Sequence, residues 1–71
     1  MRYLVVVEEG ATSFGAYVPD LPGCVAAAES REEVLQVIRD AIELHIESLK
    51  QDGRPVPPAA STSAIVDVHA A

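Results

Sequence analysis

The chain has 71 residues, of which 49% are hydrophobic and 23% charged, and its formal net charge is −6. A chain this short forms one domain with a small core, so its stability is marginal and self-association is a common remedy. The acidic balance argues against direct nucleic-acid binding, because phosphate contacts depend on clustered lysine and arginine, and it favours basic partners.

The sequence contains one cysteine, Cys24. A single cysteine forms neither an internal disulfide nor a zinc site by itself, which is typical of a protein in a reducing cytosol. The apolar run near the N-terminus, residues 3–7, is too short for a signal-peptide core or a membrane span. We therefore expect a cytoplasmic protein that does not contact a membrane.

Two strands are expected first. Residues 3–7 are apolar and rich in valine, which predicts a strand, and residues 13–18 alternate in polarity, which predicts a second one. A short connection containing Gly10 suits an antiparallel hairpin. Leu4 and Val6 share one face of the first strand, and Tyr3, Val5 and Val7 share the other. One of these faces can pack under the helix, and we expect the other to be exposed in a monomer.

The stretch PDLPGC, residues 19–24, follows the second strand. Pro19 cannot donate to a sheet ladder, and Pro22 with Gly23 marks a tight turn. Residues 24–28 then predict a third strand of small side chains. Cys24 could be a nucleophile or a buried apolar residue; no base and no helix N-terminus is placed beside it, so we interpret it as structural.

The next segment predicts one long helix. Ser30 and Glu33 have the spacing of a capping box, and Gly53 is expected to end the helix as a left-handed cap before several prolines. Apolar residues recur at helical spacing and form one stripe: Val34, Leu35, Ile38, Ala41, Ile42, His45, Ile46 and Leu49. Val37 and Leu44 border this stripe and form a second line, which we interpret as a subunit or partner contact.

A last strand is expected over residues 64–68. The resulting order, β-β-β-α-β, predicts an α+β fold in which one helix covers a mostly antiparallel sheet. The whole chain, residues 1–71, is expected to form a single domain without a separate DNA-binding domain.

No motif predicts catalysis. His45 has no second metal ligand at helical spacing, and Glu8, Glu9, Asp20 and Asp67 are scattered along the chain. Neither a phosphate-binding glycine loop nor a serine elbow is present. We therefore predict no catalytic residue, no metal and no cofactor. A residual hydrolase or nuclease would require the carboxylates to converge in space.

Several of these features occur together in one known family. The PDLPGC loop, the S-x-E-E helix start at Ser30, the triplet Ala41-Ile42-Glu43 and the G-x-P-x-P exit at Gly53 closely resemble the HicB family of antitoxins over nearly the whole chain. The resemblance implies a partial ribonuclease-H-like fold without nuclease activity. It also implies neutralisation of a HicA-type toxin, a small basic protein that cleaves mRNA.

The sequence departs from the family pattern at two places. Val25 and three alanines follow the PGC turn, where family members often have a glycine and polar residues. Many HicB proteins also continue into a C-terminal DNA-binding module, whereas this chain ends soon after the last expected strand. Separately, an orphan homo-oligomer with a regulatory or structural role, without a toxin, is the alternative.

Three sets of residues carry these expectations. We expect an acidic rim to contact the toxin, formed by Glu8, Glu9, Asp20, Glu29 and Glu32. We expect a homo-oligomer, a dimer or a tetramer, to form through Leu4, Val6, Val37 and Leu44. The scaffold depends on Pro19, Leu21, Pro22, Gly23, Cys24, Ser30, Glu33 and Gly53.

Overall fold

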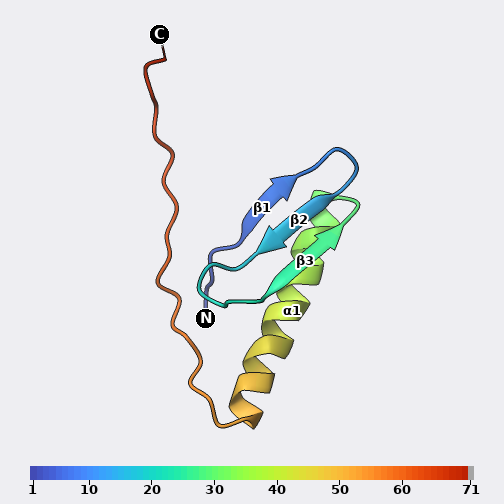
Figure 1. Ribbon diagram of the computed structural model, residues 1–71, viewed down its shortest axis with the longest axis vertical. Helices are drawn as coiled ribbons and strands as arrows, with labels where there is room; N and C mark the ends of the chain where they lie inside the picture. The colour runs from blue at the N-terminus through green and yellow to red at the C-terminus, as the bar shows by residue number, and fades with distance from the viewer. Residues whose placement is uncertain (71) are drawn as a thin grey trace.

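A computed structural model describes residues 1–70 (Figure 1). Three short strands, β1 (Val6–Glu9), β2 (Phe14–Tyr17) and β3 (Val25–Ala28), precede one long helix, α1 (Arg31–Gln51). The strands are antiparallel and lie in the order β1-β2-β3. The expected α+β class and the β-β-β-α order are confirmed.

The strand register divides the sheet into two faces. Ala16 of β2 pairs with Val7 of β1 and with Ala26 of β3, and this row faces α1. The neighbouring row, Val6, Tyr17 and Val25, therefore points away from the helix, because successive side chains alternate across a strand. We call the side of the sheet that carries this second row the open face.

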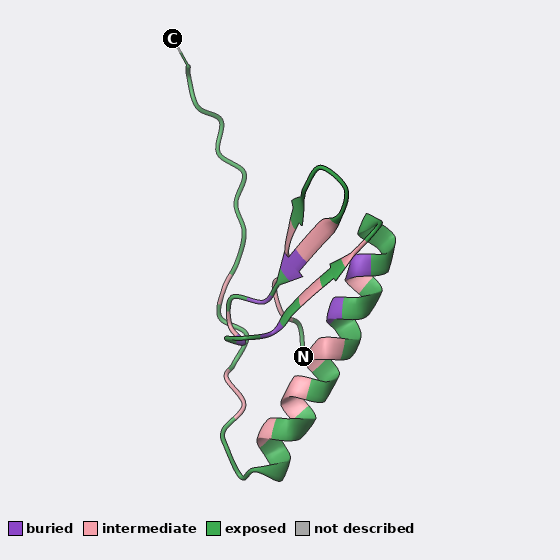
Figure 2. Cartoon of the chain, turned by 45° about the vertical axis from the view of Figure 1, so that its right-hand side comes forward, coloured by how far each residue is buried: buried purple, intermediate pink, exposed green. Residues whose placement is uncertain are grey.

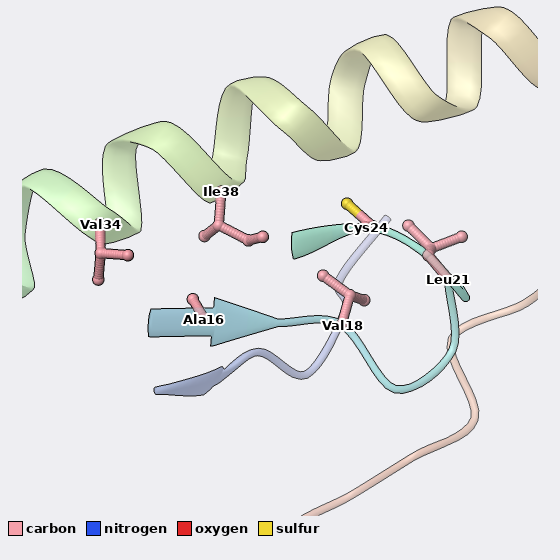
Figure 3. Close-up of a cluster of buried hydrophobic side chains, with 6 residues drawn as sticks. All are labelled: Ala16, Val18, Leu21, Cys24, Val34 and Ile38. Atoms are coloured by element: carbon pink, nitrogen blue, oxygen red, sulfur yellow. The ribbon is translucent and has the colours of Figure 1, made fainter. Parts of the chain in front are cut away.

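The core lies between the sheet and the first half of α1 (Figure 3). Six side chains are buried in it: Ala16, Val18, Leu21, Cys24, Val34 and Ile38. Leu21 and Val34 are both 0% exposed, so the loop between β2 and β3 contributes as directly as the helix. A core of this size is consistent with the marginal stability expected of a short chain.

The helix begins at a cap that involves two side chains. Ser30 Oγ accepts a hydrogen bond from the Glu33 N–H at 3.1 Å. Glu33 Oε1 accepts from the N–H of Glu29, also at 3.1 Å. The return bond of the expected capping box therefore goes to the residue before the cap rather than to Ser30 itself, and it still satisfies a free backbone donor.

The helix ends in a Schellman motif. The Arg54 N–H donates to the Leu49 carbonyl at 2.9 Å, and the Gly53 N–H donates to the Lys50 carbonyl at 3.1 Å. Gly53 has a φ of 68°, a left-handed conformation that glycine adopts at little cost.

Two consecutive turns bring the PDLPGC loop into the core. The Leu21 N–H donates to the Val18 carbonyl at 3.1 Å, and the Cys24 N–H donates to the Leu21 carbonyl at 3.0 Å. The second turn has Pro22 and then Gly23, with φ 85°, at its centre, which is the pattern of a type II turn. These turns point Leu21 and Cys24 toward the helix (Figure 3).

Replacing Gly23 by valine is expected to lower the free energy of unfolding by about 1–3 kcal/mol. No heavy atom lies within 4 Å of a Cβ at this position, so the cost would come from the positive φ alone. Thermal unfolding followed by circular dichroism measures it. Gly15→Ala is the control, since its Cβ would lie an ordinary 3.9 Å from the Ala26 carbonyl; equal stability of both variants would contradict the prediction.

The expectation of a last strand over residues 64–68 is wrong for the isolated chain. No strand or helix follows Gln51 in the described residues, and the tail rises past the β1 side of the sheet without pairing (Figure 1). Ile65 is 99% exposed and Val68 80% exposed. A strand is stabilised by the bonds to its neighbour, and the described part of the tail forms no ladder with the sheet.

The unpaired tail also makes the chain less compact than its length allows. The radius of gyration is 14.3 Å, whereas a compact domain of 71 residues has a radius of about 11 Å. The difference reflects a tail that contributes surface without contributing to the core (Figure 2).

Candidate protein-contact surface

Four of the five candidate acidic residues lie at one end of the molecule. Glu8 and Glu9 complete β1, and Glu29 and Glu32 flank the start of α1. The register brings these segments together: Glu9 pairs with Phe14, which in turn pairs with the last residue of β3 (Figure 1). We call this group, Glu8, Glu9, Glu29 and Glu32, the acidic end.

The side chains of the acidic end are all exposed. Arg31 lies between Glu29 and Glu32 in the sequence, so the acidic end includes one positive charge but remains net negative. Exposed carboxylates contribute little affinity each, but together they attract a basic protein and orient it during encounter.

Asp20 lies at the other end of the sheet, where it holds the tail. Its Oδ2 accepts hydrogen bonds from the N–H groups of Ala60, at 2.9 Å, and Ser61, at 2.8 Å. Its Oδ1 accepts a third from the Ser61 hydroxyl at 2.8 Å. These bonds, with those from Ser61 first, hold the pKa of Asp20 below its ordinary value of 3.8. The structure therefore places Asp20 apart from the acidic end and assigns it an anchoring role that the sequence analysis missed.

Tyr3 provides a second anchor for the tail. Its hydroxyl donates to the Pro57 carbonyl at 2.6 Å, across 54 positions of sequence. Between Pro57 and Ser61 the tail is thus tied both to the N-terminal segment and to the β2–β3 loop. No local pattern in the sequence predicts these contacts of the tail. The one sequence feature compatible with them is the run of serine and threonine that begins at Ser61.

The anchor at Asp20 is expected to titrate. Because its pKa is lowered in the folded state, its stabilising contribution is present at neutral pH and is lost only as pH falls through that lowered pKa, below 3.8. Amide chemical shifts of Ala60 and Ser61, followed by NMR, should report this midpoint. Asp20→Asn should abolish the transition, because a carboxamide does not ionise, and should weaken the bonds from both N–H groups, because their shared acceptor loses its charge. Asp67→Asn, in the exposed tail, is the control.

The candidate oligomer contacts do not form one surface. Val6 is half-buried and belongs to the open face, as the register of β1 shows. Leu4 is also half-buried, but it precedes β1 and lines a hollow with the tail residues Ala59 and Ser61. Val37 and Leu44 lie on α1, which covers the opposite face, and they are 40% and 67% exposed.

Two residues of the open face were missed by the sequence analysis. Tyr17 and Val25, which are 41% and 67% exposed, extend the apolar row of Val6 across the sheet. The alternation of residues along the strands could have indicated that Tyr17 and Val25 belong to one face. Whether that face is exposed depends on the side of the sheet on which the helix packs.

A groove lies between the N-terminal segment and α1. It has a volume of about 390 Å³ and is lined by Met1, Tyr3 and Val5 on one side and by residues between Leu35 and Ile46 of α1 on the other. It arises because the helix packs mainly over β3 and β2. Its volume lies within the range of ligand pockets, which start at about 300 Å³.

The groove is apolar, with one charged pair at its rim. Arg39 Nε lies 3.9 Å from Glu43 Oε1, and both side chains are largely exposed. No serine, cysteine or histidine lines it. This lining is suited to contact with an apolar side chain of a partner.

Cys24 is 4% exposed, and burial raises the pKa of its thiol. An activated nucleophile requires the opposite shift. Within residues 1–70, no three His, Cys, Asp or Glu side chains cluster as a metal site would require. No helix in this part of the chain is long and apolar enough to cross a membrane.

A three-stranded antiparallel sheet backed by one helix, with carboxylates at one end and an apolar open face, defines a small acidic α+β domain with surfaces suited to protein contact. The chain belongs to the HicB-like antitoxin family of bacterial toxin–antitoxin systems, whose model matches residues 3–70. The resemblance carried by the PDLPGC loop and the helix exit is thereby confirmed.

Individual relatives agree with this assignment. The chain is 43% identical over 47 residues to a UPF0150 protein of Helicobacter pylori, covering 66% of this chain and 65% of that protein. It is 41% identical over 57 residues to a UPF0150 protein of Synechocystis, covering 79% and 72%. It is 32% identical over 71 residues to Antitoxin HicB 2 of Photorhabdus laumondii, covering 99% of this chain and 51% of that antitoxin. No solved structure gives a significant match.

Proposed function

We propose that this protein is an antitoxin that neutralises a small basic mRNA-cleaving toxin of the HicA type by direct protein–protein contact. The family match over residues 3–70 carries the proposal, since it covers nearly the whole chain. The net charge of −6 supports it, because a protein that binds RNA through basic residues attracts an acidic partner.

In the proposed complex, charge and apolar surface have separate roles. The acidic end attracts the toxin and occupies basic residues that would otherwise contact RNA phosphates. The apolar groove beside α1 receives a side chain of the toxin and provides the tight contact, since affinity is concentrated in a few well-packed apolar anchors. Inhibition then follows from occlusion, without any catalytic step by the antitoxin.

The proposal includes three further properties: a partial ribonuclease-H-like fold, the absence of nuclease activity and a cytoplasmic location. The β-β-β-α arrangement is a partial ribonuclease-H-like fold without nuclease activity, in line with the scattered carboxylates at Glu9, Asp20 and Asp67. The protein acts in the cytoplasm, where mRNA is translated and where the free thiol of Cys24 stays reduced.

Co-expression with a HicA-type toxin from the same genome tests this function. The chain should restore growth, co-purify with the toxin and inhibit cleavage of a synthetic mRNA at stoichiometric ratio. An unrelated acidic protein of equal net charge controls for charge alone. Continued cleavage with no complex at micromolar concentrations would overturn the proposal.

A further inference from the structure

The helix covers only part of the sheet side on which it packs. α1 lies mainly over β3 and β2, and β1 is the strand farthest from it (Figure 1). Neighbouring strands are about 4.8 Å apart, whereas packed helices are about 8–10 Å apart, so one helix is about as wide as two strands. The groove lies where this cover ends, between α1 and the N-terminal segment that leads into β1.

The groove is long enough to receive a row of apolar side chains. Leu35, Ile42 and Ile46 line it from α1, and Met1 and Val5 line the opposite wall. Leu35 and Ile46 are 11 positions apart on the helix, which corresponds to about 16 Å, or three helical turns. An amphipathic helix laid along such a groove presents apolar residues to it at spacings of three and four positions.

The polar groups of the two walls favour a helix over an extended peptide as the occupant. The backbone of α1 is hydrogen-bonded within the helix, and the Tyr3 hydroxyl already donates to the Pro57 carbonyl at 2.6 Å. An extended peptide laid against α1 would bury N–H and C=O groups that find few partners there, which costs free energy. A helix satisfies its own backbone groups and presents only side chains.

The charges beside the groove favour a basic occupant. Arg39 and Glu43 lie at the rim, 3.9 Å apart and 75% and 70% exposed, so their ion pair is weak and both can pair with a partner. The sequence of α1 contains five carboxylates against three lysine and arginine side chains. A basic protein complements this surface, whereas a second copy of this chain, with its net charge of −6, opposes like charges.

We propose that the groove holds an amphipathic helix of the toxin, which lies along α1 and covers β1 on the same side of the sheet. This inference rests on the proposed antitoxin function and specifies its contact. The toxin helix places its apolar residues against Leu35, Ile42 and Ile46 and a basic residue beside Glu43. It completes the helical layer that α1 alone leaves open over β1.

Isothermal titration calorimetry with a catalytically inactive HicA-type toxin tests the site. Ile46→Glu is expected to weaken binding by about tenfold or more, because a carboxylate would be buried among apolar side chains. Ile46 lines the groove but lies outside the buried core, so the variant should fold, which circular dichroism checks. Leu44→Glu is the matched control, since it adds the same charge to α1 at a residue that is 67% exposed and lies outside the groove.

The outcomes separate this inference from the proposed function. If the wild type binds the toxin and Ile46→Glu binds equally well, or if both variants are weakened equally, the groove is not the contact and the antitoxin function stands. If the wild type forms no complex, both proposals are overturned.

Photocrosslinking tests whether the occupant is a helix. Leu35 and Ile46 are replaced in turn by the photoreactive residue p-benzoylphenylalanine, and mass spectrometry identifies the linked toxin residues. The two links should lie about 11 positions apart within one toxin helix, because both helices rise about 1.5 Å per residue. A separation of about five positions would indicate an extended strand, at about 3.3 Å per residue. That result, or links to a second copy of this chain, would refute the inference.

Discussion

Replacing Leu21 by alanine is expected to destabilise the protein by about 2–5 kcal/mol, the range for a large buried residue cut to alanine. Leu21 is 0% exposed, and the two turns of the PDLPGC loop hold it in the core. A domain of this length has a total stability of only about 4–10 kcal/mol. The variant should therefore be partly unfolded at physiological temperature.

Urea denaturation followed by circular dichroism measures this loss. Leu44→Ala is the control, because Leu44 is 67% exposed and its truncation should change stability by about 0.5 kcal/mol or less. If the two variants were equally stable, the loop would not contribute to the core as the structure indicates.

Reversing charge at the acidic end is expected to slow association with the toxin that we propose as the partner. The double variant Glu29→Lys with Glu32→Lys changes the net charge from −6 to −2, since each substitution adds two positive charges. Association with the basic toxin should slow by about tenfold or more at low salt, because steering depends on the complementary field. Surface plasmon resonance against immobilised toxin measures the rate.

The matched control places the same charge change at the far end of α1. Glu47→Lys with Asp52→Lys also gives a net charge of −2, at exposed residues away from the acidic end. The difference between the two variants should shrink in high salt, as screening removes steering. Equal slowing by both variants would show that total charge, rather than the acidic end, attracts the toxin.

Local signals in the sequence were sufficient to predict the secondary structure up to the helix end. Ser30, Glu33 and Gly53 act within four or five residues of the groups they bond, so the helix limits follow from short-range chemistry. Pro22 and Gly23 likewise set a turn whose hydrogen bond spans three residues. The family assignment rests on these same short motifs.

The path of the tail could not be predicted from such signals. Residues 64–68 have the composition of a strand, but a strand requires a partner, and composition does not provide one. The tail is instead positioned by Asp20 and Tyr3, which bond to it across 40 to 54 positions of sequence.

The sequence by itself determined the turns, the caps, the apolar periodicities and the acidic balance, because each depends on residues close together in the chain or on composition alone. Only the tertiary structure decided which sheet face is covered, since both faces of the first strand are apolar and the side from which α1 packs selects one. It also decided that Glu8 and Glu29 share one end while Asp20 holds the tail at the other, because strand register and long-range hydrogen bonds join residues whose separation in sequence carries no signal.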